Sequence, residues 1–248
     1  MLLSEFFAEN KQVALAFSGG VDSAYLLYAA KSCGCDVRAY YVKSPFQPQF
    51  ELEDAKRLAR ELDAPMTILE LDVLSEEAIS RNGPDRCYHC KRRIFRTILD
   101  AAAADGYSLL MDGTNASDDA GDRPGMQALR ELAVRSPLRE CGLTKDDVRR
   151  LSRAAGLFTW DKPAYACLAT RIPTGTPITR EKLAATEAAE NILSELGFTD
   201  FRVRLAGEDA KIQLPENQLE HLLRCRAAVV EQLKPYYRSI TLDLEVRP

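Results

Sequence analysis

The segment Ser18-Gly19-Gly20-Val21-Asp22-Ser23 constrains the fold of this chain more than any other. It follows an apolar run at 13–17 and opens a helical pattern, which predicts a strand, a glycine turn and a helix start. Two glycines let several backbone N–H groups approach one anion, and the helix N-terminus adds the positive end of its dipole. The segment therefore predicts a phosphate site. The alternative is an ordinary connection in which Asp22 or Ser23 caps the helix.

This turn differs from the lysine-containing phosphate loop of many nucleotide-binding proteins. The chain has no Gly-x-x-x-x-Gly-Lys-Ser/Thr motif, and no lysine falls inside the turn. The six residues resemble the PP-loop of the ATP pyrophosphatases. That resemblance implies that the turn holds the pyrophosphate of ATP and that the enzyme transfers AMP to a substrate oxygen.

Apolar stretches alternate with helical patterns along the first two thirds of the chain. Strands are expected at 13–17, 37–42, 66–71 and 108–111, and helices at 22–31, 51–62, 91–104 and 145–155. This alternation predicts an α/β fold with a doubly wound parallel sheet and ligands at the carboxyl ends of its strands. The polar segment 112–119, which includes Gly113 and Asn115, follows such a strand and is expected to face the same nucleotide; the alternative is a surface loop.

A second, smaller α/β domain is expected after a proline-rich segment. Three prolines and a glycine lie between Pro163 and Pro177, which indicates irregular backbone and a domain boundary. The predicted division is 1–172 and 173–248. The expected elements are helices at 179–196 and 215–233 and strands at 201–205, 211–214 and 239–246.

Composition is that of a globular enzyme, with 46% hydrophobic and 28% charged residues. The net charge of −4, and a balance of 11 basic to 12 acidic residues from Arg171 onward, argue against a nucleic-acid partner. No run is long enough to span a bilayer, and the N-terminus does not read as a signal peptide, so no membrane association is expected. Seven cysteines without an export signal favour the reducing cytoplasm and metal or catalytic roles.

Three cysteines form a candidate metal site. Cys87 and Cys90 have a spacing that lets one loop bind a metal through both thiols, and Cys167 lies in a loop that the fold is expected to bring to the same strand-end face. Three thiolates would hold a four-iron cluster with one open iron. A zinc site completed by His89 or His221, and a redox pair of Cys87 and Cys90, are the alternatives. The other cysteines are expected to be structural, as packed apolar residues: Cys33, Cys35, Cys141 and Cys225.

Arg202 and Arg204 lie two residues apart on a predicted strand, so their guanidinium groups share one face. Such a pair can bind a phosphate or a carboxylate. The alternative is a solvated strand face balanced by Glu208 or Asp209.

Together these motifs resemble the LarE family from about Val13 to Glu245. The segments that carry the resemblance are the PP-loop, 86–91, 112–118, 123–125, 136–138, 160–163, 167–173 and 202–204. The resemblance implies an ATP-dependent sulfurtransferase that adenylates carboxylates of pyridinium-3,5-biscarboxylic acid mononucleotide. Sulfur then replaces oxygen, toward the nickel-pincer nucleotide cofactor of lactate racemase.

The resemblance also implies roles for individual residues. ATP would bind at Ser18, Gly19, Gly20, Asp22, Ser23, Gly113 and Asn115, with Asp22 holding Mg²⁺, and the small domain would bind the substrate phosphate through Arg202 and Arg204. Cys167 would be catalytic, either by giving up its own sulfur or, with Cys87 and Cys90, by holding a [4Fe-4S] cluster that carries a sulfide. The presence of all three cysteines favours the cluster. The source of the sulfide is not implied.

The family resemblance further implies a homo-oligomer, with a hexamer as the expected form. The family usually continues past the last strand with a Gly-Tyr-Arg-like tail, whereas this sequence ends in Glu245-Val246-Arg247-Pro248. Whether Arg247 replaces the arginine of that tail stays open, so Arg247 is not assigned to the site. Two rival functions remain at this point. One is a PP-loop tRNA thiolase, and the other is a non-catalytic, zinc-stabilised nucleotide-binding protein.

Overall fold

The computed structural model describes residues 2–118 and 124–247 of the chain. Two compact units make up the molecule: Met1–Val73 with Asp85–Pro163 forms unit 1, and Leu74–Pro84 with Ala164–Pro248 forms unit 2. Along the second half of the chain, unit 1 ends at Pro163 and unit 2 resumes at Ala164. The functional domain boundary expected between residues 172 and 173 stays a prediction. Asp119 and Arg123, which belong to segments singled out in the sequence, lie outside the described residues.

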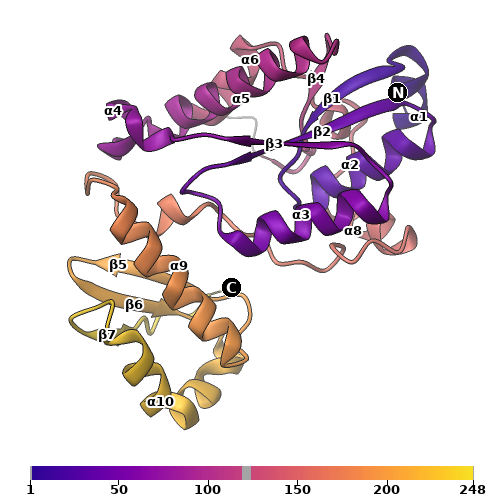
Figure 1. Cartoon of the computed structure of the whole chain (residues 1–248). Coiled ribbons are helices and arrows are strands. Elements are labelled where there is room, and N and C mark those ends of the chain that lie inside the picture. The colour runs from indigo at the N-terminus through magenta and orange to yellow at the C-terminus, as the bar shows by residue number, and fades with distance from the viewer. Residues whose placement is uncertain (1, 119–123, 248) are drawn as a thin grey trace. The chain divides into compact units, whose positions relative to one another are not determined.

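Unit 1 contains a four-stranded parallel sheet, as the alternating pattern predicts (Figure 1). Its strands are β1 (Gln12–Ala16), β2 (Asp36–Lys43), β3 (Met66–Glu70) and β4 (Leu110–Met111), in the order β3-β2-β1-β4. Every adjacent pair is parallel.

Helices cover both faces of this sheet. The helices of unit 1 are α1 (Leu3–Glu9), α2 (Val21–Ser32), α3 (Gln49–Glu61), α5 (Arg86–Ala104), α6 (Pro124–Glu131), α7 (Pro137–Glu140) and α8 (Lys145–Ala154). Strand residues alternate between two apolar clusters: Val13 and Leu15 pack with α2, α3 and α8, whereas Ala14 packs with α5 and α6. The doubly wound arrangement of the prediction is therefore confirmed.

The chain order reverses between β1 and β4. The first three strands run outward from β1 on one side, and the chain then crosses to β4 on the other side, where Leu15 lies beside Met111. In open α/β sheets ligands bind at such a reversal, beyond the carboxyl ends of the strands. The turn at 18–23 and the segment from Asp112 both begin at this point.

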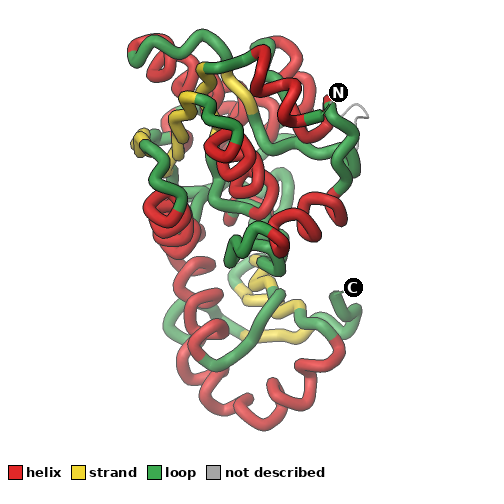
Figure 2. The backbone as a smooth tube through the Cα atoms, turned by 90° about the vertical axis from the view of Figure 1, so that its right-hand side faces the viewer, coloured by secondary structure: helices red, strands yellow, loops and turns green. Residues whose placement is uncertain are grey.

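Unit 2 combines a three-stranded sheet with two long helices (Figure 2). It contains α9 (Arg180–Glu195), β5 (Arg202–Ala206), β6 (Asp209–Gln213), α10 (Leu219–Leu233) and β7 (Ile240–Leu242). β5 and β6 are antiparallel, while β6 and β7 are parallel. The predicted second α/β unit is present, with a shorter last strand than the apolar pattern at 239–246 indicates.

A short segment of the first half of the chain belongs to unit 2. Residues 74–84, which include α4 (Glu77–Ser80), pack there through Asn82, which is fully buried. Its amide nitrogen donates to the carbonyl oxygens of Pro173 at 2.8 Å and Thr176 at 2.9 Å. Across residues 2–118 and 124–247, no helix is both long and apolar enough to cross a membrane.

Candidate functional site

The glycine turn after β1 has the geometry that its sequence requires. Gly19 has a φ of +73°, and a Cβ there would come within 3.1 Å of the Cβ of Ala55 on α3. Gly20 is the N-cap of α2, so the turn leads directly into the helix N-terminus. The hydroxyls of Ser18 and Ser23 lie 3.1 Å apart and brace the turn from within. Such a helix start presents backbone donors and a positive dipole end to an anion.

The segment after β4 lies against this turn. A Cβ on Gly113 would lie 2.8 Å from the backbone nitrogen of Ser23, so only glycine permits this close approach. The amide of Asn115, 2% exposed, donates to Oδ1 of Asp22 at 3.1 Å. The structure therefore brings Asp22, Ser23, Gly113 and Asn115 together, as expected for two segments that share one nucleotide.

A lysine that sequence reasoning did not assign completes this group. Nζ of Lys145, the first residue of α8, lies 2.5 Å from Oδ2 of Asp22. The backbone nitrogen of Lys145 donates to Oγ of Ser117 at 3.0 Å, which ties α8 to the segment after β4. A lysine at the first position of a helix is electrostatically unfavourable, and that oddity was the available sequence signal.

Cys87 and Cys90 lie in the first turn of α5 rather than in a loop. The helix begins at Arg86, five residues before the predicted start at 91, so the two thiols are three residues apart on one helix. Cys87 is exposed and Cys90 half-buried. The buried guanidinium group of Arg86, the residue before Cys87, donates a hydrogen bond to the sulfur of Cys87 at 3.3 Å.

Cys167 lies in unit 2, immediately before a 3₁₀ turn at Leu168–Arg171. Its carbonyl accepts hydrogen bonds from the backbone nitrogen and the hydroxyl of Thr170, at 3.0 and 2.8 Å. The thiol is half-buried. The backbone around it is therefore held in one conformation.

Arg202 and Arg204 both reach the segment that carries Cys167. Arg202 donates to the carbonyl of Ala164, and Arg204 donates to that of Thr170 at 2.9 Å, so the two guanidinium groups bind three residues before and three residues after the cysteine. The shared strand face expected from their spacing is thus turned toward this segment.

A buried carboxylate anchors the same segment. Glu190 of α9, 5% exposed, accepts from Nε of Arg171 at 2.8 Å, from the hydroxyl of Tyr165 at 2.5 Å and from the backbone nitrogen of Val203 at 3.0 Å. Sequence reasoning missed Glu190. The sequence did contain a signal for it: Glu190 is a charged residue on the face of α9 that is buried, together with Leu183, Thr186 and Leu193.

The arginine cluster around Cys167 carries excess positive charge. It consists of Arg171, Arg202, Arg204 and Arg247, and its carboxylate partners are Glu190 and Asp200. Burial lowers the pKa of the Arg202 guanidinium, and the neighbouring charges of Arg171 and Arg247 lower it further. An anion bound here would relieve this strain between like charges. Arg247, unassigned from sequence, bonds to Asp200 at 3.0 Å.

The three candidate metal ligands come from both units, Cys87 and Cys90 from unit 1 and Cys167 from unit 2. Among the described residues no group of three or more His, Cys, Asp or Glu side chains is gathered to hold a metal ion. His89 instead bonds to Asp85 at 3.0 Å, and His221 bonds to the carbonyl of Leu196 at 2.8 Å. The chemistry of the three thiols fits an iron–sulfur cluster, and their role stays a prediction.

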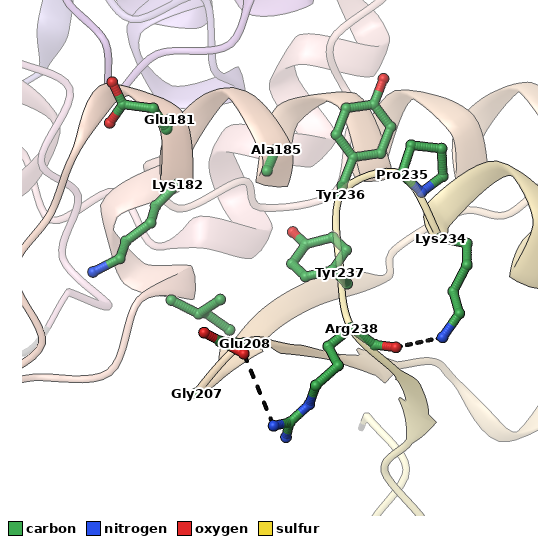
Figure 3. Close-up of a pocket in the computed structure, with 11 residues that line it drawn as sticks. Glu181, Lys182, Ala185, Gly207, Glu208, Lys234, Pro235, Tyr236, Tyr237 and Arg238 are labelled. Carbon is green, nitrogen blue, oxygen red and sulfur yellow. Dashed lines mark hydrogen bonds and ion pairs between the residues drawn. The ribbon is translucent and has the colours of Figure 1, made fainter.

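A separate pocket of about 640 Å³ opens in unit 2 (Figure 3). It is lined by α9, the turn between β5 and β6, and the turn that follows α10. Arg238 spans part of it by pairing with Glu208 at 3.8 Å and with Asp209 at 3.0 Å. The described residues that line it include none of the predicted site residues.

Comparison with known proteins finds a relative with an assigned reaction over most of the length of both chains. The chain is 37% identical over 237 residues to a pyridinium-3,5-bisthiocarboxylic acid mononucleotide synthase of Lactiplantibacillus plantarum, covering 94% of this chain and 86% of that protein. It is also 36% identical to an uncharacterized protein of Synechocystis sp. over 98% of this chain and 92% of that protein.

Two further similarities cover smaller parts of the chain. A tRNA-specific 2-thiouridylase of Clostridium botulinum is 28% identical over 182 residues, covering 60% of this chain and 52% of that protein. A family model described as queuosine biosynthesis protein QueC matches residues 12–83, which contain the glycine turn, β2 and β3.

Proposed function

The chain belongs to the LarE family of pyridinium-3,5-bisthiocarboxylic acid mononucleotide synthases, and from this premise we propose that it converts carboxylates of pyridinium-3,5-biscarboxylic acid mononucleotide to thiocarboxylates. It is an ATP-dependent sulfurtransferase. The observation that carries the proposal is 37% identity over 94% of the chain. The product would serve the nickel-pincer nucleotide cofactor of lactate racemase.

ATP activates the carboxylate in this proposal. A carboxylate resists nucleophiles because it is negatively charged and has no good leaving group, and a mixed anhydride with AMP removes both obstacles. Ser18, Gly19, Gly20 and Ser23 bind the phosphates, and Asp22 holds the Mg²⁺ that offsets the charge of the departing pyrophosphate. Support comes from the glycine turn, which lies at the chain reversal of the sheet beside Gly113 and Asn115.

The substrate phosphate is assigned to Arg202 and Arg204. Their support is the excess of guanidinium groups in the arginine cluster and the position of both side chains beside the Cys167 segment. A substrate bound there by its phosphate lies near the sulfur-transferring residue. Arginine binds phosphate through two parallel hydrogen bonds, which fix orientation as well as affinity.

Sulfur transfer is assigned to Cys167 with Cys87 and Cys90. We propose that the three thiolates would hold a [4Fe-4S] cluster, which would supply the sulfide that displaces AMP from the activated carboxylate. Other residues of the chain position the reactants: the PP-loop orients ATP, and Arg202 and Arg204 orient the substrate. We also propose that the enzyme acts in the cytoplasm as a homo-oligomer, with a hexamer as the expected form, which light scattering on the purified protein would test.

The first test is metal content. Protein purified without oxygen should contain about four iron atoms and matching acid-labile sulfide, with a broad brown absorbance that is lost in Cys87→Ala. One zinc per chain would contradict the cluster. Absence of iron and zinc would point to Cys167 as a sacrificial donor, visible as a mass loss after one turnover.

The second test separates activation from sulfur transfer. Cys167→Ser should abolish thiocarboxylate formation but keep substrate-dependent release of pyrophosphate, because the ATP site is in unit 1. Arg202→Ala with Arg204→Ala should raise the substrate KM far more than the ATP KM, whereas Arg224→Ala with Arg226→Ala, on the exposed face of α10, should change neither. No pyrophosphate release with the biscarboxylated nucleotide would contradict the proposal.

A tRNA thiolase is the second candidate function, on the partial similarity of this chain to the 2-thiouridylase. Mass spectrometry of tRNA from a deletion strain decides between them. Loss of one thionucleoside would replace the proposed substrate with tRNA.

A further inference from the structure

One face of α10 carries apolar side chains between two opposite charges and is exposed to solvent. The other face packs into unit 2 through Leu222, Val229 and Leu233, and α10 contacts α9 there. The exposed side chains follow the spacing of one helix face and form the α10 stripe: Glu220, Leu223, Ala227, Val230 and Lys234. We propose that the α10 stripe binds the same stripe of a second copy of this chain, with the two helices antiparallel. The inference rests on the proposed function only through its homo-oligomer.

The centre of the α10 stripe is apolar and exposed. Leu223 is 69% exposed and Val230 41% exposed, and the small side chain of Ala227 lies between them. Removing such side chains from water is favourable in proportion to the apolar area that is buried. Among the described residues, most of the exposed large apolar side chains belong to unit 2, although it is the smaller unit: Leu223, Val230, Tyr236, Leu244 and Val246. Unit 2 therefore offers a partner more apolar surface of this kind than unit 1 does.

The charges at the two ends of the α10 stripe identify the partner as a second copy. Glu220 lies in the first turn of α10, and Lys234 caps its C-terminus. In an antiparallel pair with a two-fold axis at Ala227, Glu220 of each copy comes opposite Lys234 of the other, because both lie seven residues from the axis. Leu223 of each copy comes beside Val230 of the other. A parallel pair would instead bring like charges together at both ends, which is unfavourable.

The contacts that the end charges make within the chain leave them accessible. The Glu220 carboxylate, 89% exposed, pairs with Arg224 at 3.7 Å. The Lys234 ammonium donates to the carbonyl of Arg238 (Figure 3). Contacts of this kind at the surface contribute little to stability, so each end charge can also meet the opposite charge of a second copy. Ala227 at the axis lets the two helices approach closely, because the side chains at a crossing point set the distance between helix axes.

The symmetry of this contact determines what it can assemble. A two-fold contact uses the same surface on both copies, so one contact joins two copies and then closes. In a hexamer made of two rings of three, contacts of this type join one ring to the other. The α10 stripe therefore supplies the contact between the two halves of the proposed hexamer, and it supplies the whole interface if the assembly is a dimer.

The test measures the mass of the assembly by sedimentation velocity on the full chain. Leu223→Arg should halve that mass, because it replaces apolar contact by like charges beside the two-fold axis. Gln232→Arg adds the same charge to α10 at an exposed position outside the stripe, and it should keep the mass of the wild type. An unchanged mass in Leu223→Arg, or a wild type that sediments as a monomer, would overturn the proposal.

Charge reversal tests the antiparallel direction and excludes simple misfolding. Glu220→Lys should raise the dissociation constant of the contact about tenfold, because lysines then face lysines at both ends. Adding Lys234→Glu should restore the wild-type value, because opposite charges meet again with their positions exchanged. A double variant that dissociates as readily as Glu220→Lys would overturn the proposal. These experiments measure mass and not catalysis, so an assembled protein that releases no pyrophosphate with the biscarboxylated nucleotide would refute the proposed reaction and leave the α10 stripe assigned.

Discussion

Glu190 shows how one side chain can order a reactive segment. Its carboxylate joins α9 to Tyr165 and Arg171 on either side of Cys167, and also to the backbone of β5. A buried carboxylate is costly unless donors surround it, and Glu190 has several. The arrangement holds the cysteine between two fixed points.

Replacing Glu190 with Gln should destabilise the protein strongly. The substitution leaves the buried guanidinium of Arg171 without its counter-charge, and breaking a buried pair in this way costs about 3–5 kcal/mol. Urea denaturation of Glu190→Gln measures it. The control is Glu195→Gln on the exposed face of α9, with an expected change within about 0.5 kcal/mol, and a similar small change for Glu190→Gln would contradict the anchoring role.

The cysteines differ in reactivity for physical reasons. Cys35 is 6% exposed, and burial raises the pKa of its thiol to about 11, with Asp36 adding to the shift. Cys87 is exposed at the start of α5. The thiol, and not the reactive thiolate, is therefore the form of Cys35 at neutral pH.

Alkylation of metal-free protein should follow this difference. At pH 8 only about one Cys35 side chain in a thousand is a thiolate, so iodoacetamide should modify Cys87 first and Cys35 increasingly as pH approaches 11. Peptide mass spectrometry over a pH series measures both rates. Equal rates at pH 8 would show that Cys35 is not protected.

At the scale of elements, the segment 74–84 depends on Asn82. Asn82 has a φ of +58°, a conformation that asparagine tolerates better than most residues, and its side chain satisfies carbonyls of the 172–176 turn. The segment is thus attached to unit 2 by the side chain of Asn82, together with backbone hydrogen bonds from Gly175 to the Asn82 carbonyl and from Ile178 to the Ser80 carbonyl, both 2.8 Å.

Replacing Asn82 with Ala should loosen this segment. Buried carbonyls lose their donor and the backbone conformation becomes strained, for an expected loss of roughly 2–4 kcal/mol in the free energy of unfolding. Limited proteolysis should then cut within 74–84 faster than in wild type. Asn217→Ala, at an exposed position, is the control, and equal cutting rates in the two variants would contradict the attachment.

The elements predicted from sequence were those with strong periodicity. The four parallel strands, α2, α3 and α8 follow from apolar runs and helical patterns, and the site segments at their ends follow from the rule for parallel sheets. α6 and α7 were not predicted, because they are short and depend on packing. The start of α5 was placed too late, because its first turn is polar and carries the cysteines.

Side-chain partners at the site were harder to predict. Gly113, Asn115 and Asp22 were expected to share one ligand, and the structure brings them together. Lys145 and Glu190 were missed, since each meets partners far away in sequence: 123 residues separate Lys145 from Asp22. No local pattern encodes such a pairing.

At the scale of the whole molecule, nucleotide binding should change amide hydrogen exchange in unit 1 and leave α10 of unit 2 unchanged. The glycine turn, the segment after β4 and the start of α8 all belong to unit 1, and the arginine cluster belongs to unit 2. A magnesium complex of a non-hydrolysable ATP analogue should therefore slow amide hydrogen exchange at 18–24, 112–118 and 144–148, while exchange in α10 stays unchanged. Slower exchange in α10 with the same regions unaffected would refute the assignment of the nucleotide site.

The two units alternate along the chain: residues 74–84 belong to unit 2 but lie between the two segments of unit 1, and the rest of unit 2 begins at Ala164. A ribosome therefore releases 74–84 about 80 residues before Ala164, where the rest of its unit begins. The partners of Asn82 follow it by 90 to 94 residues, so at roughly 5–20 residues per second the segment waits about 5–19 s for them. During that interval Ile79 and Asn82, which are fully buried in the folded protein, are accessible to proteases and other chains, so the time of emergence from the ribosome is a vulnerable point in the life of this protein.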